Sequence, residues 1–311
     1  GAMAWGDEWF DGMTRNPWNV KEGSSGSSAG SAAAAAAGLV GFTLGSETLG
    51  SIVSPSRRCG TSGLRPTFGR VSRHGCMALA WSMDKVGPIC RSVEDCALVF
   101  GAIHGYDGLD PTAVDRSFSW PPQRDLRTLR VGYLDNGLPE ESRGDLKVLR
   151  DLGVSLLRIQ LPDEYPEWAL TLILGVESSA MFDTLVRTNN LEGTGRWPNE
   201  LREAQFVPAI EYIRAQRIRT LLMQAMDRVF EKVDCYIGGD DLVITNLTGH
   251  PSVVLPGGFA QRDNRRVPFG ITFTGQLYED ETLLSVAHAY QQATRHHLER
   301  PAMEDVVPEN L

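Results

Sequence analysis

A stretch of small residues near the start of the chain decides the fold: Gly23-Ser24-Ser25-Gly26-Ser27-Ser28-Ala29-Gly30-Ser31, which runs directly into the alanines of 32–37. A Gly/Ser stretch alone is typical of a flexible linker. A linker seldom continues into alanines, because alanine has the highest helix propensity of all residues. We therefore predict a tight loop that leads into a buried helix of small side chains, with Gly38 as its C-terminal cap.

Beyond this helix, short apolar runs alternate with segments of helical periodicity. A short buried strand is predicted at 40–44, and a second loop of small residues follows it at 45–51. Further strands are predicted at 130–134, 156–161, 233–237, 252–255 and 269–273, and helices at 92–104, 145–152, 208–232 and 281–298. This alternation indicates an α/β domain with a largely buried sheet.

The composition excludes several classes of protein. Of 311 residues, 42% are apolar and 22% charged, and the net charge of −9 is unfavourable for direct binding to nucleic acid. The longest apolar stretch, 32–44, is shorter than the ~18 residues of a membrane-spanning helix, and no signal-peptide pattern precedes it. Five cysteines without a C-x-x-C pair predict free thiols in a cytoplasmic protein rather than a zinc ribbon or a redox motif.

Two short serine motifs are candidates for a catalytic role. Residues 26–30 match the G-x-S-x-G nucleophile elbow with Ser28 at the centre, but no buried strand precedes them, as that motif requires. Ser82-Met83-Asp84-Lys85 matches the S-x-x-K motif of penicillin-recognising enzymes, without the S-D-N and K-T-G motifs that accompany it. Such short matches arise easily by chance, and for Ser82 to Lys85 a polar surface turn is the favoured interpretation.

A longer pattern joins the two small-residue loops. Its core is 26–31 followed by Gly45-Ser46-Glu47-Thr48-Leu49-Gly50-Ser51-Ile52. It continues through Gly63-Leu64-Arg65-Pro66-Thr67-Phe68-Gly69-Arg70, Asp84-Lys85-Val86-Gly87-Pro88, Arg91-Ser92-Val93-Glu94-Asp95 and Asn246-Leu247-Thr248-Gly249-His250-Pro251. Over nearly its whole length the sequence resembles the amidase signature family of serine amidohydrolases. The resemblance implies a central mixed β-sheet covered by helices on both faces.

The resemblance also implies a catalytic site. Ser51 matches the nucleophile, and Ser27 matches a serine that follows a non-proline cis peptide and relays the proton. A lysine upstream of both loops completes the family's Ser–Ser–Lys triad. The oxyanion hole would consist of the backbone N–H groups of Thr48, Leu49, Gly50 and Ser51. A serine hydroxyl needs a neighbouring base to become a nucleophile, and a hydroxyl can relay a proton because it both donates and accepts. No cofactor and no metal are expected.

The sequence departs from the family pattern in two places. The lysines are Lys21, Lys85, Lys147 and Lys232, and none of them matches the upstream lysine. We therefore expect an N-terminally incomplete or degenerate member, inactive by itself. In addition, Glu47 and Val53 stand where members commonly have Asp and Arg, so the usual acid–arginine pair is not expected; Arg57 or Arg58 is left open as a replacement.

One domain over 1–311 is expected. It would consist of a signature core at 23–112, a helical cover at about 162–233 and a C-terminal part of the sheet with a closing helix at 234–311. Within the cover, 168–206 is the expected specificity region, because it carries no signature motif.

Three functions remain open at this stage. The first is an amidase that cleaves a small-molecule carboxamide through an acyl-enzyme. The second is the A subunit of a tRNA-dependent amidotransferase, and the third is a non-catalytic amidase-like binding protein. No direct contact with nucleic acid or a membrane is expected, and a homodimer is left open.

Overall fold

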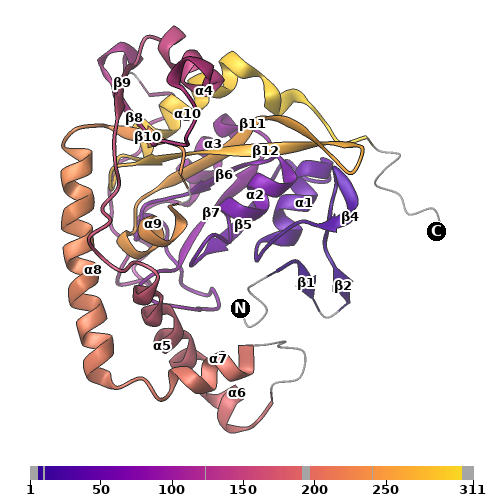
Figure 1. Cartoon of the computed structure of the whole chain (residues 1–311). Coiled ribbons are helices and arrows are strands. Elements are labelled where there is room, and N and C mark those ends of the chain that lie inside the picture. Colours follow the sequence, from indigo (N-terminus) through magenta and orange to yellow (C-terminus); the bar gives the residue numbers. More distant parts are fainter. Residues whose placement is uncertain (1–5, 10, 123, 191–196, 240, 303–311) are drawn as a thin grey trace.

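A mixed eight-stranded sheet forms the centre of the molecule (Figure 1). The computed structural model describes residues 6–9, 11–122, 124–190, 197–239 and 241–302. The strands β8, β9 and β10 run parallel to one another, and all other neighbours in the sheet are antiparallel. In spatial order the strands are β5 (Phe42–Glu47), β7 (Lys85–Cys90), β6 (Ser62–Arg65), β11 (Ser252–Arg262), β12 (Arg265–Gly275), β10 (Cys235–Ile237), β8 (Arg130–Tyr133) and β9 (Ser155–Arg158).

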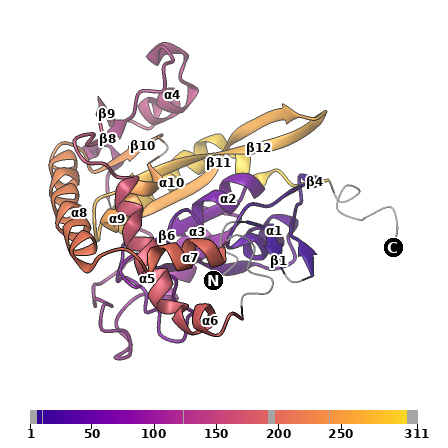
Figure 2. The same cartoon turned by 60° about the horizontal axis from the view of Figure 1, so that its bottom comes forward.

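Helices cover both faces of this sheet, as the family resemblance implied (Figure 1). On one face lie α3 (Val93–Ile103), α4 (Gly144–Asp151) and α10 (Asp280–Thr294). On the other lie α1 (Ala29–Ala37), α2 (Val53–Cys59), α8 (Ala209–Phe230) and α9 (Leu242–Thr248). A third group, α5 (Leu172–Met181), α6 (Asp183–Arg187) and α7 (Trp197–Ala204), packs on α8 through α5 (Figure 2). None of the helices in the described ranges is long and apolar enough to cross a membrane.

Short elements complete the fold. The two small antiparallel pairs are β1 (Glu8–Trp9) with β2 (Gly12–Met13), and β3 (Arg15–Asn16) with β4 (Asn19–Gly23). Single 3₁₀ turns occur at Leu126–Thr128, Glu140–Ser142, Ala169–Thr171 and His296–Leu298. All five cysteines are free thiols, and only Cys76 is exposed.

The helix of small residues is confirmed. Ala32 and Ala35 on α1 are fully buried and pack against Ile52 and Ile89. The helix ends at Gly38, whose φ of 76° is left-handed and therefore suits glycine. The alanines allow α1 to lie close to both α2 and the sheet, which brings the two small-residue loops together.

The strand predicted at 40–44 is placed correctly but is not buried. It runs over Phe42–Glu47 as β5, at the edge of the sheet, and the side chains of Phe42 and Leu44 are 56% and 45% exposed. The reason is that Phe42, Leu44 and Ser46 share one face of the strand, which is exposed, whereas Gly45 and Glu47 on the opposite face are buried. Along one edge β5 pairs with β7. Its other edge is closed by serine hydroxyls, since Ser31 Oγ donates to the carbonyl of Leu44 at 2.8 Å.

The remaining predicted elements are present with shifted ends. The closing helix, expected at 281–298, ends at Thr294 because Arg295 takes a left-handed φ of 58°. The strands expected at 252–255 and 269–273 are longer, since they extend together as the hairpin β11–β12. The apolar pattern did not reveal β6, β7 or α9, which overlap the signature motifs, nor the two small pairs at the N-terminus.

Candidate active site

The two small-residue loops meet beside the end of β5. The Gly26–Ser27 peptide bond is cis, as the resemblance implied, and the N–H of Ser28 donates to the carbonyl of Ser51 at 3.1 Å. Ser27 is exposed and Ser51 half-buried, and both line one cavity. No hydrogen bond joins their two hydroxyls in the described part of the chain, so their direct contact stays a prediction.

The buried carboxylate of Glu47 shapes the loop that carries Ser51. Its Oε2 accepts the backbone N–H groups of Ile52 and Val53 at 2.8 and 2.9 Å. Its Oε1 accepts from Arg65 at 2.7 Å and from Asn246 at 2.8 Å. One side chain therefore ties the start of α2 to strand β6 and helix α9.

The arginine that pairs with Glu47 is Arg65. Both side chains are fully buried, and neither candidate from the sequence takes this place: Arg57 donates to Thr272, and Arg58 pairs with Glu22. Burial alone would raise the pKa of Glu47, but the charge and hydrogen bonds of Arg65, with the N–H groups that it accepts, lower the pKa to about 2. The usual pair with position 53 is absent, as expected, but its replacement is neither Arg57 nor Arg58: the partner of Glu47 comes from β6.

The turn between Glu47 and Ile52 leaves its own N–H groups unused. Within the described residues, the backbone N–H groups of Thr48, Leu49, Gly50 and Ser51 donate no hydrogen bond, whereas the next two N–H groups are taken by Glu47. Gly50 has a φ of 96°, a left-handed conformation that favours glycine. Consecutive unpaired N–H groups of this kind can bind an anion or a developing oxyanion.

The position of Ser28 does not fit a nucleophile elbow. Its Oγ lies 3.2 Å from both the N–H and the carbonyl of Ser46, so its hydroxyl accepts from and donates to the same backbone residue. The close approach requires glycine at 45, because a Cβ there would lie 2.7 Å from this Oγ. The preceding strand β4 belongs to a two-stranded pair outside the main sheet. Ser28 therefore closes the edge of β5, and the structure gives the elbow no support.

The sequence favoured a polar surface turn for the segment Ser82 to Lys85, and the structure contradicts this interpretation. Ser82 is held by Glu177 of α5, which accepts its hydroxyl at 2.7 Å, and by Arg219 of α8, which donates to the same hydroxyl at 2.7 Å. Met83 and Lys85 are buried. Two helices of the cover thus hold this segment in place against β7.

Asp84 connects this segment to the loop of Ser51. Its carboxylate accepts the hydroxyl of Thr48 at 2.6 Å and the N–H groups of Leu79 and Ala80 at 2.8 to 3.1 Å. Asp84 therefore holds the first residue of the turn, whereas Glu47 holds the N–H groups that follow it. The sequence did not reveal the roles of the two carboxylates, Glu47 and Asp84. Asp84 and Arg65, the partner of Glu47, nevertheless lie inside the quoted motifs.

Lys85 is the one lysine among the described residues that lines the cavity. Its amine is buried and donates to the carbonyl of Met83. Burial and the nearby Arg65 hold the pKa of Lys85 well below its usual range, against the opposing effects of Glu47 and Asp84. Lys21 is exposed at β4 and Lys147 pairs with Asp151 at the surface.

The cavity that contains Ser27 and Ser51 has a volume of about 980 Å³. No described residue of 168–206, the expected specificity region, lines it. That segment packs behind the wall, where Phe182, Trp197 and Leu201 form one buried cluster with Leu79. The lining residues are Ser27, Ser28, Ser31, Leu44, Gly45, Ser46, Thr48, Ser51, Arg73, His74, Cys76, Met77, Ala78, Leu79, Trp81, Asp84, Lys85, Val86, Leu109, Asp110, Pro111 and Thr112.

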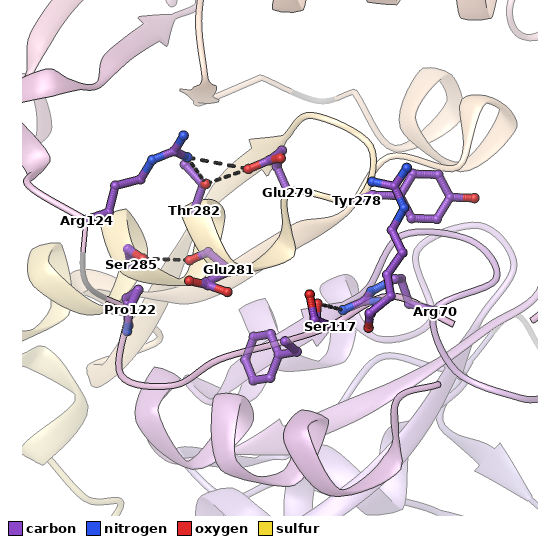
Figure 3. A pocket seen from close by; sticks show the side chains of 11 residues that line it. Arg70, Ser117, Pro122, Arg124, Tyr278, Glu279, Glu281, Thr282 and Ser285 are labelled. Carbon is purple, nitrogen blue, oxygen red and sulfur yellow. Dashed lines mark hydrogen bonds and ion pairs between the residues drawn. The ribbon is translucent and has the colours of Figure 1, made fainter. Parts of the chain in front are cut away.

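A second cavity, of about 640 Å³, lies at the start of α10 and is rich in arginine (Figure 3). Its charges are largely paired within the protein. Arg124 contacts Glu279 at 3.4 Å, and the buried Arg70 lies 3.6 Å from Asp280. Arg116 stacks on the ring of Tyr278 at 4.5 Å. Neither serine loop reaches this cavity.

Comparisons with known proteins agree with the fold. The family model named Amidase matches residues 6–238. The chain is 35% identical to the A subunit of the glutamyl-tRNA(Gln) amidotransferase of Bacillus pumilus (strain SAFR-032), over 93% of this chain and 71% of that protein. Its fold is similar to the peptide amidase of Stenotrophomonas maltophilia, with a TM-score of 0.76, 30% identity, and 93% and 69% of the two chains covered. The A subunit of the glutamyl-tRNA(Gln) amidotransferase of Thermotoga maritima gives a TM-score of 0.68 at 27% identity, over 89% and 68% of the chains.

Proposed function

Because this chain belongs to the amidase signature family, whose enzymes hydrolyse amides, we propose that it hydrolyses a linear carboxamide through an acyl-enzyme on Ser51, with release of ammonia or an amine. The observation that carries the proposal is the turn Thr48 to Ser51, whose backbone N–H groups donate no hydrogen bond within the described residues and whose first and last residues line the cavity. A carbonyl oxygen in this turn would gain hydrogen bonds as it becomes negative. Loss of one such donor typically costs about 2.7–4 kcal/mol of transition-state stabilisation.

The reaction would proceed in two halves. Ser51 Oγ attacks the amide carbon while its proton passes to Ser27 and on to a base; the C–N bond then breaks, and the proton returns to the leaving nitrogen. In the second half water attacks the acyl carbon, the ester bond to Ser51 breaks, and the carboxylic acid leaves. Both halves pass through an oxyanion that the same turn would stabilise. No cofactor is required.

The reaction needs a base that accepts the proton from Ser27. In the family it is a lysine upstream of both loops, and no lysine of 1–311 matches that position. We therefore expect residues 1–311 by themselves to release little ammonia from simple amides, in comparison with the complete gene product. If the two turn over equally and Lys85→Met abolishes the activity, Lys85 is the base and the upstream assignment is wrong.

The relatives' names favour one second candidate. As an amidotransferase component, the chain would pass ammonia from glutamine to a partner that holds an aminoacyl-tRNA, and proteins named as such A subunits are 35% identical to it. Purification of the complete gene product from its own cells would distinguish the two functions. A stable complex with a tRNA-binding partner and glutamine-dependent ammonia release would favour the amidotransferase. The free cysteines support a reducing compartment, the cytoplasm, for either function.

Covalent labelling tests the nucleophile. A fluorophosphonate probe should label the complete gene product once, at Ser51, and Ser51→Ala should abolish labelling, whereas Ser28→Ala should leave Ser51 reactive. Labelling that persists on Ser28 would restore the elbow interpretation. Absence of both labelling and ammonia release would favour a non-catalytic binding protein.

A further inference from the structure

We infer that the substrates of this site are uncharged amides with an apolar or aromatic group, which lies against Trp81 and its apolar neighbours. The inference rests on the proposed function and adds the substrate class to it. It follows from the composition of the outer cavity wall, whose residues the sequence did not single out.

Exposed apolar side chains gather on this wall. Leu44, Met77, Trp81 and Leu109 line the cavity, yet 45%, 67%, 48% and 60% of their surfaces remain exposed. They come from three separate segments of the chain, namely β5, the turn before β7 and the loop after α3. Single exposed apolar residues need no explanation, but several that converge on one cavity indicate a binding surface.

The arginine on the wall is already saturated. Arg73 pairs with Asp110 at 2.9 Å, and its five N–H donors meet five acceptors. The other acceptors are the carbonyls of Trp81 and Asp84, the second carboxylate oxygen of Asp110 and the hydroxyl of Thr112. A carboxylate on a substrate would have to displace one of these partners, because a guanidinium has no further donor to offer.

The other charged groups of the cavity offer no better partner. Lys85 is buried, with its amine on the carbonyl of Met83 and a pKa well below its usual range because of burial and Arg65. Asp84 and Asp110 are acidic and would repel a carboxylate. His74 lies exposed at the rim. Glutamine carries both a carboxylate and an ammonium group, so this wall fits it less well than an apolar amide.

Binding to the Ser51→Ala variant tests the substrate class without a need for turnover. Phenylacetamide and glutamine are titrated calorimetrically into this variant of the complete gene product. Phenylacetamide should bind at least ~10-fold more tightly than glutamine. A buried aromatic contact is typically worth a factor of about 10 or more, so the further change Trp81→Ala should weaken phenylacetamide about 10-fold. Trp81→Phe should retain most of the affinity.

Trp168→Ala is the matched control, because Trp168 is 67% exposed and lies outside the cavity. It should leave both affinities unchanged. Glutamine binding as tightly as phenylacetamide, no binding of either, or equal losses for the two Trp→Ala changes would each overturn the inference. Labelling of Ser51 in the unmodified protein separates the outcomes: labelling without phenylacetamide binding overturns the substrate class alone, and binding without labelling overturns the nucleophile alone.

Discussion

The two sides of the cavity are built in opposite ways. On the inner side, the loop from Glu47 to Val53 is held by buried, paired groups, above all the fully buried Glu47–Arg65 pair. On the outer side, Met77 and Leu109 stand out into the solvent, with more than half of their surfaces exposed. The inner side is fixed by interactions that reach β6, α2 and α9, whereas the apolar side chains of the outer side remain largely exposed.

This difference separates two tasks. A turn that presents N–H groups to a reacting oxygen has to be preorganised, because reorganisation during the reaction would reduce its electrostatic contribution. A wall that selects a substrate group needs only exposed apolar surface of suitable size. Changes on the inner side should therefore lower stability, and changes on the outer side should alter binding while stability stays the same.

The largest expected effect comes from breaking the buried ion pair. Arg65→Met leaves the carboxylate of Glu47 buried without its cation, which typically costs about 3–5 kcal/mol. Urea unfolding of residues 1–311 measures the loss of unfolding free energy. The double variant Glu47→Gln with Arg65→Met should lose less than Arg65→Met alone, since it buries no unpaired charge.

Arg58→Met is the matched control for this prediction. Arg58 pairs with Glu22 at 3.0 Å, but its side chain is 41% exposed, and exposed ion pairs contribute about 0–1 kcal/mol. Equal losses for the two arginine variants would remove the distinction between a buried inner side and an exposed outer surface.

Glu47 should also make stability depend on pH. Its pKa falls from 4.5 to about 2 in the folded chain, in spite of burial, because Arg65 and the N–H groups that it accepts stabilise the carboxylate. A carboxyl with a lowered folded pKa stabilises the fold above its unfolded pKa, and this contribution is lost as the pH falls from about 4.5 toward 2. The shift corresponds to about 3 kcal/mol. Urea midpoints measured across this range should fall less steeply in Glu47→Gln than in the unmodified chain; identical slopes would contradict the prediction.

The sequence predicted the parts of this site that depend on local backbone chemistry. The alanine helix and its cap at Gly38 are present as expected. The cis bond before Ser27 is also present, but only the family resemblance implied it. It did not predict the pairing of Glu47 with Arg65, because their separation in the chain carries no local signal and the partner depends on how β6 lies beside β7. The exposed face of β5 was missed for a similar reason, since an apolar run does not reveal which face of a strand other elements cover.

A smaller effect is expected where Asp84 fixes the turn. Thr48→Val removes the hydroxyl that donates to Asp84 at 2.6 Å, while the N–H groups of Leu79 and Ala80 keep the carboxylate hydrogen-bonded. A hydrogen bond to a charged group contributes about 1.5–3 kcal/mol, and the remaining partners favour the lower end. Thr188→Val, at an exposed helix end, should change the unfolding free energy by less than about 0.5 kcal/mol. A loss no larger for Thr48→Val than for this control would show that the turn does not depend on Asp84.

The smallest effect on stability is expected on the outer wall. Leu109 is 60% exposed, so Leu109→Ala removes little buried surface and should change the unfolding free energy by less than about 0.5 kcal/mol. The same change removes apolar surface from the cavity wall, so the affinity of the Ser51→Ala variant for phenylacetamide should fall while its urea midpoint stays in place.

Leu98→Ala is the matched control, because Leu98 is 59% exposed and does not line the cavity. Leu98→Ala should leave both the midpoint and the affinity unchanged. If Leu109→Ala instead lowers the midpoint as Arg65→Met does, the outer wall is part of the folded framework, and the division between a fixed inner loop and an exposed binding wall is wrong.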